Sequence, residues 1–535
     1  MMAFFIMKNY ILQIIFLVSC VFSYNTYNDD DWFFIINPKN IKSITQDSFN
    51  MHFLAENGIF SYDLITQDFF YNTNLSNKSI DDKKEFIHYE KSNDYFFVLT
   101  KKYIYHKSSV ASYWNQNRLS NFNISSFSSI QNIGFNNQYI FFKSKNKYIV
   151  VDIFSMISNT YKNLEKFSDI NWINIENEFI DLTDFYTFND DVIYEDYILD
   201  ESGVQNFVTS TAYDKYDNLW IGMSTGAIYK VEDSSFEIVR IDTGPRLDYI
   251  SNIYKDKQSN WYFVDNYFRR TGMIDSKYDG YLVSIWNEDN NQWKHIAKNE
   301  SIFASDITIN NIEKFDRFII FATFKGLVIY DTSNDSWSQH YTFLNAANRV
   351  VWDIEFFDEK VYFSTSDGIV ECTWLILDDE LEFYFNKSIL TNYEIYDIKF
   401  FENELYIASS QGLYNYNISK DEIAIIDDSK YYNIEIFDSY ILSSNKNLWY
   451  IDDEGRKLLS NRIENFSVND SQTIVCGTDH YEIKVIDLNS QEEWILTLDY
   501  FNRDSFIYTI GCDDQWLWFV SDQGTNFFKW SNYEK

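Results

Sequence analysis

Proline and cysteine are almost absent from this chain, and histidine and glycine are scarce: its 535 residues include 2 prolines, 4 cysteines, 6 histidines and 15 glycines. Four widely separated cysteines do not make a disulfide framework, and no C-x-x-C pair indicates a zinc site. With so little proline and glycine, tight turns fall mainly to Asn and Asp, whose short side chains tolerate left-handed backbone. We expect Cys372, Cys476 and Cys512 to be buried apolar thiols.

Histidine patterns that bind metals or assist catalysis are also missing. The six histidines are dispersed, without an H-E-x-x-H pair. The acidic run NDDD at residues 28–31 lacks the alternating ligand spacing of a calcium-binding EF loop, and the chain has no Gly-rich phosphate loop. No metal and no cofactor is therefore expected, and the catalytic residues of an enzyme, if it is one, stay unknown.

Basic residues are outnumbered: 44 Lys and Arg stand against 80 Asp and Glu, which gives a formal net charge of -36. Such a surface repels nucleic-acid phosphates, and the chain has no basic stripe that would offset the repulsion. Nucleic acid is therefore not expected as a partner. Acidity by itself confers solubility, and it leaves cations, basic proteins and neutral glycans open as ligands.

Aromatic residues are abundant instead. They make up 20% of the chain, and Ile, Tyr, Phe and Asn recur throughout, which favours pleated, half-buried strands over helices. The length exceeds what a single hydrophobic core usually supports, so several domains or an array of repeats is expected. The chain is predicted to be all-β.

The first residues resemble a secretory signal. Lys8 precedes an apolar run, residues 10–22, that is short for a membrane span. Two cleavage sites stay open: cleavage after Ser23 removes residues 1–23, whereas the motif LVSC resembles a bacterial lipobox, in which cleavage removes residues 1–19 and lipid is attached to Cys20. Both predict a secreted, periplasmic or cell-surface bacterial protein. No later segment suits a membrane span, so membrane contact is expected only through that lipid anchor.

The segment WIGMSTGAIYKV, residues 220–231, contains G-x-S-x-G, the pattern of a nucleophile elbow. The chain repeats this segment, and most copies have no serine at the position of Ser224. What six copies share is a glycine, suited to the positive φ of a hairpin: Gly58, Gly226, Gly326, Gly368, Gly412 and Gly524. Strand-like alternation follows, whereas a nucleophile elbow is followed by a helix. Ser224 is therefore predicted to lie in a structural hairpin of a blade.

The spacing of the repeats predicts propeller blades. Neighbouring copies recur at the length of a four-stranded blade, about 40 to 50 residues. Eleven repeat starts, with room for one more, predict tandem β-propellers of about eleven or twelve four-stranded blades, because one ring holds about 4 to 8. An acidic, less regular segment marks the boundary between them. We expect an N-terminal propeller over 24–200, with C-terminal strands available to help close it, and a C-terminal propeller over 201–535.

One copy of the repeat is close to a known consensus. DNLWIGMSTGAIYKV resembles the two-component-regulator propeller repeat, roughly D-x-x-G-x-L-W-I-G-T-x-x-G-L, which is found in periplasmic sensor propellers and in surface proteins of the PorZ type. Met223 stands where threonine is usual; the matching residues are Asp214, Trp220, Ile221, Gly222 and Gly226. The resemblance implies the fold more than a function. Because the chain ends directly after its last repeat, without a kinase or sorting domain, a sensor that signals within one polypeptide is not expected.

Two functions stay open at this point. The first is an extracytoplasmic binding or scaffold protein whose propeller faces recognise a glycan, a peptide or a protein partner. The second is an enzyme acting on polysaccharides, with acid and base carboxylates brought together at a channel mouth. The sequence singles out no such pair among its 80 carboxylates, so binding is favoured over catalysis. Inward-facing carboxylates with one in an apolar setting would support the enzyme.

Overall fold

The fold is that of a computed structural model. It describes residues 32–530 apart from 72–74, 76–82, 175–179, 265–280, 298–308, 341–349, 497–506 and short segments of one to three residues. The predicted signal sequence, residues 1–23, and the predicted lipid-bearing Cys20 lie outside the described residues. Within the described part of the chain, no helix has the length and apolar character needed to cross a membrane.

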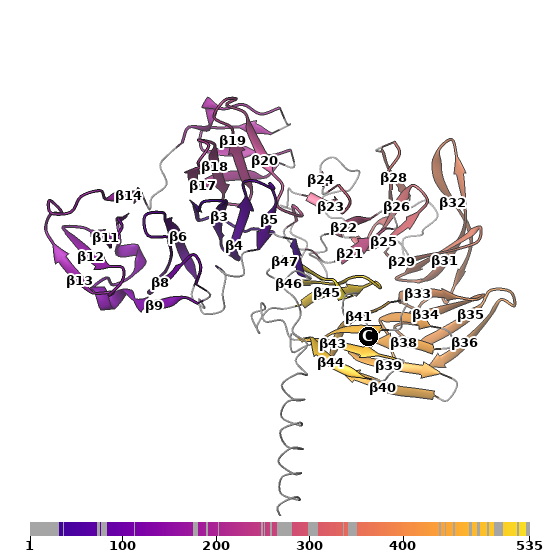
Figure 1. Cartoon of the computed structure of the whole chain (residues 1–535). Helices are drawn as coiled ribbons and strands as arrows, with labels where there is room; N and C mark the ends of the chain where they lie inside the picture. The colour runs from indigo at the N-terminus through magenta and orange to yellow at the C-terminus, as the bar shows by residue number, and fades with distance from the viewer. Residues whose placement is uncertain are drawn as a thin grey trace, which may run out of the picture.

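Short antiparallel strands make up nearly all of the described structure (Figure 1). They form eleven sheets, of which nine have four strands, one has five and one has six. Successive strands are mostly hairpin neighbours, because apolar residues alternate with others on both sides of each turn and give every strand a face to bury. The predicted all-β class, built from about eleven or twelve mostly four-stranded blades, is confirmed.

Seven of the sheets form a ring, which we call the seven-sheet ring. Six of them are made of four consecutive strands each: β21–β24 (Asn252–Lys255, Asn260–Val264, Tyr281–Asn287, Gln292–Ala297), β25–β28 (Ile309–Phe315, Phe318–Thr323, Gly326–Asp331, Ser336–His340), β29–β32 (Val351–Phe357, Lys360–Thr365, Gly368–Leu377, Glu380–Ile389), β33–β36 (Ile395–Phe401, Glu404–Ser409, Leu413–Asn417, Glu422–Asp427), β37–β40 (Asn433–Phe437, Tyr440–Ser444, Asn447–Asp452, Gly455–Asn461) and β41–β44 (Ile463–Val468, Thr473–Thr478, Ile483–Asp487, Glu493–Leu496). The seventh sheet contains β45 (Ile507–Cys512), β46 (Leu517–Ser521), β47 (Gly524–Phe528) and β1 (Trp32–Ile35). The first strands β25, β29, β33 and β37 contact one another in this order, and β45 contacts both β41 and β21, as the inner strands of propeller blades do.

A hydrophobic core fills each interface of the ring, including the one between its last and first sheets. At that interface Trp261 packs edge-on against Trp518 and Phe527. Burying one large apolar side chain contributes about 1.5 to 3 kcal/mol, so the ring is stabilised all the way around without disulfides. Cys372, Cys476 and Cys512 are free and buried within it.

The seventh sheet joins distant parts of the chain. β1 pairs antiparallel with β47, with Trp32 opposite Phe528 and Ile35 opposite Thr525. The sequence suggested that C-terminal strands help to close the N-terminal propeller. The observed exchange runs the other way, because an N-terminal strand completes the C-terminal ring.

The remaining sheets make a four-sheet unit. They are β2–β5 (Ser43–Gln46, Asn50–Ala55, Gly58–Asp63, Phe69–Tyr71), β6–β9 (Lys84–Glu90, Tyr95–Thr100, Tyr103–Ser108, Asn115–Arg118), β10–β14 (Asn132–Phe135, Tyr139–Ser144, Lys147–Asp152, Ser158–Tyr161, Asn171–Asn174) and β15–β20 (Val192–Ile193, Tyr197–Leu199, Gln205–Tyr213, Leu219–Met223, Ile228–Val231, Ile238–Ile241). Three short 3-10 helices accompany them: η2 (Leu119–Phe122), η3 (Phe127–Ser129) and η4 (Leu182–Asp184). Shared cores join β10–β14 to β6–β9, β6–β9 to β2–β5, and β2–β5 to β15–β20.

The predicted boundary at residue 200 lies inside the sheet β15–β20. β16 and β17, on either side of that residue, pair with each other, with Tyr197 opposite Phe207. The acidic, irregular segment that suggested a boundary therefore adds short strands to the edge of a sheet. The change from the four-sheet unit to the ring falls between β20 and β21.

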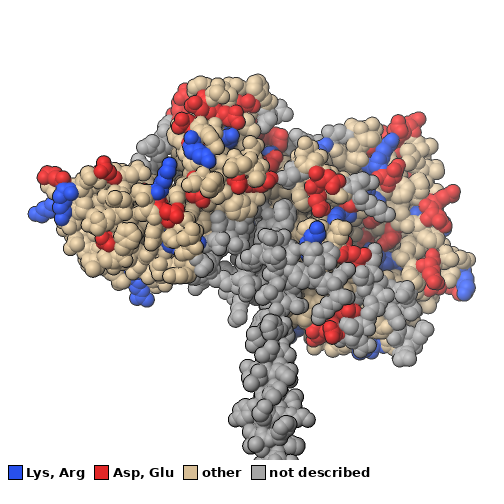
Figure 2. Space-filling view, viewed as in Figure 1, with Lys and Arg blue, Asp and Glu red and all other residues tan. Residues whose placement is uncertain are grey.

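Two segments of chain cross between the four-sheet unit and the ring. The first crossing, residues 36–42, joins β1 to β2, and the second crossing, residues 242–251, joins β20 to β21. The side-chain amide of Asn37 donates a hydrogen bond to the main-chain oxygen of Leu247, so the two crossings are tied to each other. Acidic side chains are interspersed with basic ones over the visible faces of both units (Figure 2).

Candidate functional site

The hairpin glycines of the repeats lie at the turn between the second and third strands of the four-stranded sheets, or between the fourth and fifth strands of β15–β20. Five of them begin or directly precede the third strand, at β4, β27, β31, β35 and β47, and Gly226 lies between β18 and β19. Three have clearly positive φ, namely +96° at Gly226, +102° at Gly326 and +92° at Gly368. Ser224 belongs to the same kind of turn: its hydroxyl accepts a hydrogen bond from the main-chain N–H of Phe207 (3.1 Å), and a strand rather than a helix follows.

Both glycines of the G-x-S-x-G segment pack against the first crossing. A Cβ at Gly222 would lie 2.4 Å from the side chain of Ile41, and a Cβ at Gly226 would lie 1.8 Å from the main-chain oxygen of Pro38. The main-chain N–H of Ile41 also donates to the oxygen of Met223 (3.0 Å). The pattern that resembles a nucleophile elbow therefore serves as the surface that holds the first crossing.

Ionisable side chains and one asparagine line the inner strands of four neighbouring sheets of the ring. We call them the inner polar belt: Asn311 and Glu313 on β25, Asp353 and Glu355 on β29, Asp397 and Lys399 on β33, and Glu435 on β37. The members of one sheet are two residues apart, so they share a face of their strand. The repeats INNIEKF, VWDIEFF and IYDIKFF carry this pattern at equivalent positions. In the sequence these segments predict inner strands, but they do not by themselves predict the belt.

The belt connects each inner strand to the next. The Asn311 amide donates to Asp353. Asp353 accepts a hydrogen bond from the main-chain N–H of Ile398 (3.1 Å), and Asp397 accepts one from that of Ile434 (2.8 Å). Carboxylates that accept main-chain N–H groups across a sheet boundary hold neighbouring blades in register.

Lys399 is the basic member of the belt. Its Nζ lies 3.1 Å from Glu355 Oε1 and 4.0 Å from one carboxylate oxygen of both Asp353 and Asp397. The side chain keeps 28% of its surface exposed, and that of Glu355 keeps 21%. Burial lowers the pKa of Lys399, but the surrounding carboxylates outweigh it and raise that pKa well above its usual value. The ammonium therefore stays charged.

One lysine cannot neutralise five carboxylates, so the belt retains protons. Burial, together with the charge of Glu355, raises the pKa of Glu313 to about 8. Burial also raises the pKa of Glu355 to about 7 and that of Asp397 well above its usual range, although Lys399 opposes both shifts. Glu313 is then largely protonated at neutral pH. A neutral acid close to other carboxyl groups is one of the features found in acid–base sites.

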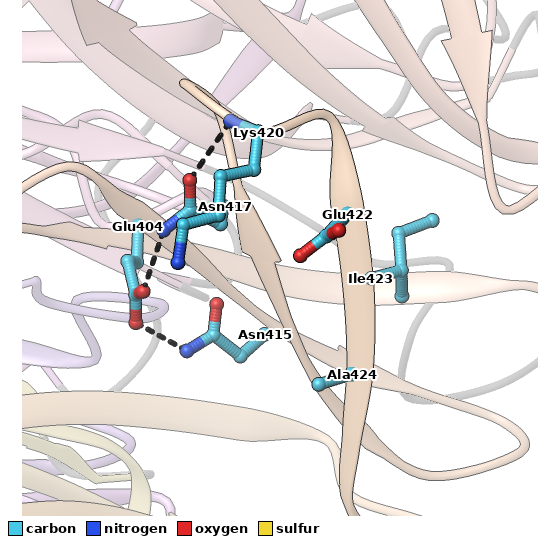
Figure 3. Close-up of a pocket in the computed structure, with 7 residues that line it drawn as sticks. All are labelled: Glu404, Asn415, Asn417, Lys420, Glu422, Ile423 and Ala424. Carbon is cyan, nitrogen blue, oxygen red and sulfur yellow. Dashed lines mark hydrogen bonds between the residues drawn. The ribbon is translucent and has the colours of Figure 1, made fainter.

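A pocket of about 390 Å³ lies on the sheet β33–β36, away from the belt (Figure 3). Its lining comes from the three outer strands and one turn: Glu404, Asn415, Asn417, Lys420, Glu422, Ile423 and Ala424. Asn415 and Asn417 are two residues apart on β35 and so share a face. Glu404 on β34 stands opposite Asn417 on that face. The volume of the pocket is at the lower end of the range for small-ligand sites.

Hydrogen bonds fix the inner side of the pocket. The carboxylate of Glu404 accepts the amide N–H groups of both Asn415 and Asn417, the latter at 2.9 Å. These two bonds hold the pKa of Glu404 below its usual value. The side-chain carbonyl oxygen of Asn417 accepts a hydrogen bond from the main-chain N–H of Lys420 (3.0 Å). Each amide is thereby oriented while keeping a second N–H for a ligand.

Three polar side-chain groups on the outer side of the pocket have no hydrogen-bond or ion-pair partner among the described residues. They are the Asn415 carbonyl oxygen, the Lys420 ammonium and the Glu422 carboxylate. In the sheet β25–β28 the residue equivalent to Asn415 is the buried Ile329. In the sheets β29–β32 and β2–β5 the equivalent residues are the buried polar Glu371 and Ser61, so the identity of this one position does not single out the pocket in the sequence.

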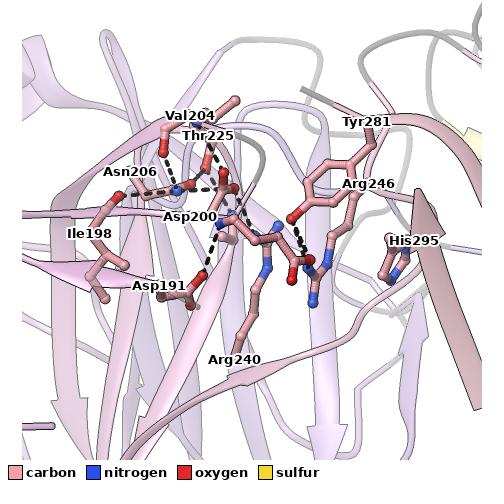
Figure 4. Close-up of polar contacts among 12 residues, drawn as sticks. Asp191, Ile198, Asp200, Val204, Asn206, Thr225, Arg240, Arg246, Tyr281 and His295 are labelled. Atoms are coloured by element: carbon pink, nitrogen blue, oxygen red, sulfur yellow. Dashed lines mark hydrogen bonds and ion pairs between the residues drawn. The ribbon is translucent and has the colours of Figure 1, made fainter. Parts of the chain in front are cut away.

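A guanidinium bridges the four-sheet unit and the ring (Figure 4). Arg246, in the second crossing, donates to Glu201 (3.0 Å), to the Tyr281 hydroxyl (2.9 Å) and to Asp242 (2.8 Å). Glu201 belongs to the four-sheet unit and Tyr281 to β23 of the ring. Burial raises the pKa of Asp242, but contacts with His295 and Arg246 outweigh it and hold that pKa well below its usual range. The cluster is internally paired and serves as a connection.

The ring has the features of a β-propeller. Its four-stranded antiparallel sheets pack face to face around an axis, with their first strands innermost. The protein is a β-propeller protein. No protein-family model matches the sequence of this propeller protein, and no curated protein is similar to it in sequence. Within its described residues, no group of three or more His, Cys, Asp or Glu is arranged to hold a metal ion.

Solved structures similar to this propeller protein are of the kinds named by the sequence resemblance. PorZ, an essential bacterial surface component of the type-IX secretion system of Porphyromonas gingivalis, is 10% identical over 93% of this chain and 87% of its own, with a TM-score of 0.46. The extracellular domain of the putative hybrid two-component system BT3049 from B. thetaiotaomicron is 11% identical over 95% of this chain and 76% of its own, with a TM-score of 0.39. The likeness is one of fold.

A eukaryotic propeller is similar as well. The β-propeller domain of Cps50 (Swd1) from Myceliophteria thermophila is 9% identical over 52% of this chain and 96% of its own, with a TM-score of 0.38. A fold does not determine a function, so the function has to be argued from this chain's own residues.

Proposed function

We propose that this protein is an extracytoplasmic binding or scaffold protein, and that the pocket on the sheet β33–β36 binds a neutral glycan. The supporting observation is the mixture of oriented donors and acceptors in that pocket: two asparagine amides pinned by Glu404, with Lys420 and Glu422 at the rim. A sugar hydroxyl both donates and accepts hydrogen bonds, so it matches amide N–H, amide oxygen, ammonium and carboxylate groups together.

Charge argues for a neutral ligand. Glu404 and Glu422 repel an anion, and Lys420 repels a cation. The methyl group of Ala424 offers a small apolar surface for the C–H face of a sugar ring. Ligand sites combine a few placed polar groups with such apolar contacts.

Isothermal titration calorimetry of the mature chain with neutral oligosaccharides, such as cello-, malto-, xylo- and chito-oligomers, tests the pocket. We expect one series to bind, and both Asn415→Ala and Asn417→Ala to weaken it by about tenfold or more, since each removes one or two hydrogen bonds. Asn386→Ala, a change of an exposed asparagine on the neighbouring sheet, is the matched control and should bind as the wild type does. Binding that survives both pocket variants would place the glycan elsewhere.

The extracytoplasmic location is supported by the N-terminal sequence. Lys8 and the apolar run that follows it suit export, and the motif ending at Cys20 suits lipid attachment. The intact mass of the protein from a bacterial host distinguishes the two processing sites. A mature chain that starts at Tyr24 shows cleavage by an ordinary signal peptidase, and one that starts at Cys20 with added acyl mass shows a lipoprotein. A mass that retains residues 1–19 would contradict export.

The inner polar belt supports a second candidate, an enzyme acting on polysaccharides. Glu313 is protonated near neutrality, and the carboxyl of Glu355 lies close enough to influence it. An acid of this kind beside a second carboxyl group is the pair that glycoside hydrolysis uses. Release of reducing ends from a polysaccharide panel, abolished in Glu313→Gln and retained in Asn415→Ala, would support the enzyme. No release by the wild type would leave the belt with its structural role.

A further inference from the structure

β31 and β32, the two outer strands of their sheet, form a hairpin that is longer than the two outer strands of any other described sheet. Both strands have ten residues, whereas the outermost strands of the other sheets in the ring have four to seven. The two-residue turn between them, Asp378 and Asp379, has positive φ at both positions (+49° and +68°), the geometry of a tight hairpin that continues the strand twist. Figure 1 shows the hairpin at the outer rim of the ring.

The hairpin is anchored on the sheet β25–β28. On its inner face Leu381 and Phe383 are buried at 1% and 7% exposure, and Trp374 packs edge-on against Phe315 with ring centroids 4.5 Å apart. At its tip Arg317 donates to the main-chain oxygen of Asp379 at 2.7 Å. The hairpin is thus held in one position rather than free in solvent, which removes part of the entropy cost of binding a partner.

The outer face of the hairpin is apolar and exposed. Leu375, Leu377 and Tyr384 are 46%, 47% and 47% exposed. The register places Leu375 opposite Glu382, Leu377 opposite Glu380 and Thr373 opposite Tyr384, so these side chains share that face. Exposed apolar clusters of this kind, bordered by polar residues, mark interaction sites on soluble proteins.

The outer edge of β32 is also open. β32 is the last strand of its sheet, and no described strand pairs with its outer side. A long, open edge with apolar side chains favours the addition of another strand, and natural proteins usually protect such edges with lysine, proline or a cover. Carboxylates rather than lysines border the tip of this edge: Asp378, Asp379, Glu380 and Glu382.

We propose that β32 is a docking edge for an extended, basic segment of a partner protein, which adds to the sheet as a further strand. Its Lys or Arg side chains lie on the outer face, where they pair with Glu380 and Glu382 beside Tyr384. Its alternate, apolar side chains lie on the other face beside Phe385, which is 53% exposed and stands opposite Cys372. Strand addition supplies main-chain hydrogen bonds, and alternate side chains supply specificity. A second copy of this chain is opposed by charge, because two such edges bring carboxylates together on a protein of net charge -36.

The test measures the fluorescence anisotropy of a labelled ten-residue peptide of alternating Val and Lys, titrated with the mature chain. The same peptide with Glu in place of Lys serves as the reference ligand. Two variants add the same positive charge at exposed positions: Tyr384→Lys on β32, which is 47% exposed, and Ile425→Lys on β36, which is 57% exposed. We expect the Lys peptide to bind the wild type and the Ile425→Lys variant, and to bind Tyr384→Lys about tenfold more weakly.

Three results would overturn the proposal. Equal loss in both variants would mean attraction by the net charge alone, and equal binding of the Glu peptide would remove the charge complementarity. Dimerisation of the wild type in light scattering, abolished by Tyr384→Lys, would make a second copy of the chain the occupant. Circular dichroism and the unfolding midpoint of both variants show that each has folded before its binding is compared.

Discussion

Gly226 lies directly against Pro38: a Cβ at residue 226 would be 1.8 Å from the main-chain oxygen of Pro38. Gly226 is in the hairpin between β18 and β19, and Pro38 is in the crossing that leads from the ring to the four-sheet unit. The same glycine also has a φ of +96°, which residues with a side chain rarely adopt. Two independent requirements for glycine therefore meet at the segment that connects the two units.

Gly226→Ala should destabilise the protein by on the order of 2 to 4 kcal/mol, because it adds a main-chain collision to the cost of positive φ. Gly455→Ala is the matched control: Gly455 has a φ of +123°, and a Cβ there meets no atom within 4 Å. We expect the control to lose only the backbone cost, about 1 to 3 kcal/mol, and therefore less than Gly226→Ala. Urea unfolding measures both variants. Equal losses would show that the contact with Pro38 contributes nothing.

The blades could be predicted from the sequence because each is a local unit. Strand alternation and a glycine hairpin lie within about 45 residues of each other, and copies such as those at Gly326 and Gly368 report the same turn. The pairing of β1 with β47 has no local signal. WFFI at residues 32–35 looks like any other apolar strand, and its partner comes at the opposite end of the chain.

The sites were harder to predict because they are departures from the repeat. Asn415 takes the position that Ile329 and Glu371 hold in their sheets, and Lys399 takes the position that Glu313 and Glu355 hold in theirs. Nothing in one strand tells whether such a residue faces solvent, a pocket or the next sheet. The face follows only from the register of the whole sheet, since a shift of one residue reverses every side chain.

Stability should fall as the pH rises through the titration of Glu313. Its pKa in the folded protein is about 8, above the 4.5 that is usual for a glutamate, so the folded state holds the proton more tightly than the unfolded state. The resulting contribution is complete below pH 4.5 and is lost as the pH rises to 8. Glu313→Gln should remove this loss, on the order of 3 kcal/mol, and so flatten the pH dependence between pH 5 and 9. Chemical unfolding at several pH values measures it, and parallel curves for variant and wild type would contradict the assignment.

The thiols of Cys372, Cys476 and Cys512 should not react in the native protein. All three are buried, and burial raises the pKa of both Cys372 and Cys476 to about 12. Because the thiolate is the reactive form, labelling by a thiol reagent at pH 8 should be negligible until denaturant is added. Ser388→Cys, at an exposed position on β32, supplies a positive control on the same fold. Rapid native labelling of any of the three would mean that its sheet interface opens readily.

Arg246 should determine whether the two units unfold together. Arg246→Met keeps the length of the side chain but removes the donors to Glu201, Tyr281 and Asp242, and it leaves two partly buried carboxylates without their cation. Removing one partner of a buried ion pair costs about 3 to 5 kcal/mol, and we expect the lower half of that range because Glu201 and Asp242 stay about a third exposed. Arg456→Met is the control, since Arg456 has similar partners, Asp427 and Tyr431, but all of them lie within the ring. Calorimetry should show one transition for the wild type and the control, and an earlier, separate transition of the four-sheet unit for Arg246→Met. A single transition in all three proteins would mean that the tie between Asn37 and Leu247 and the packing around Gly226 are enough to couple the two units.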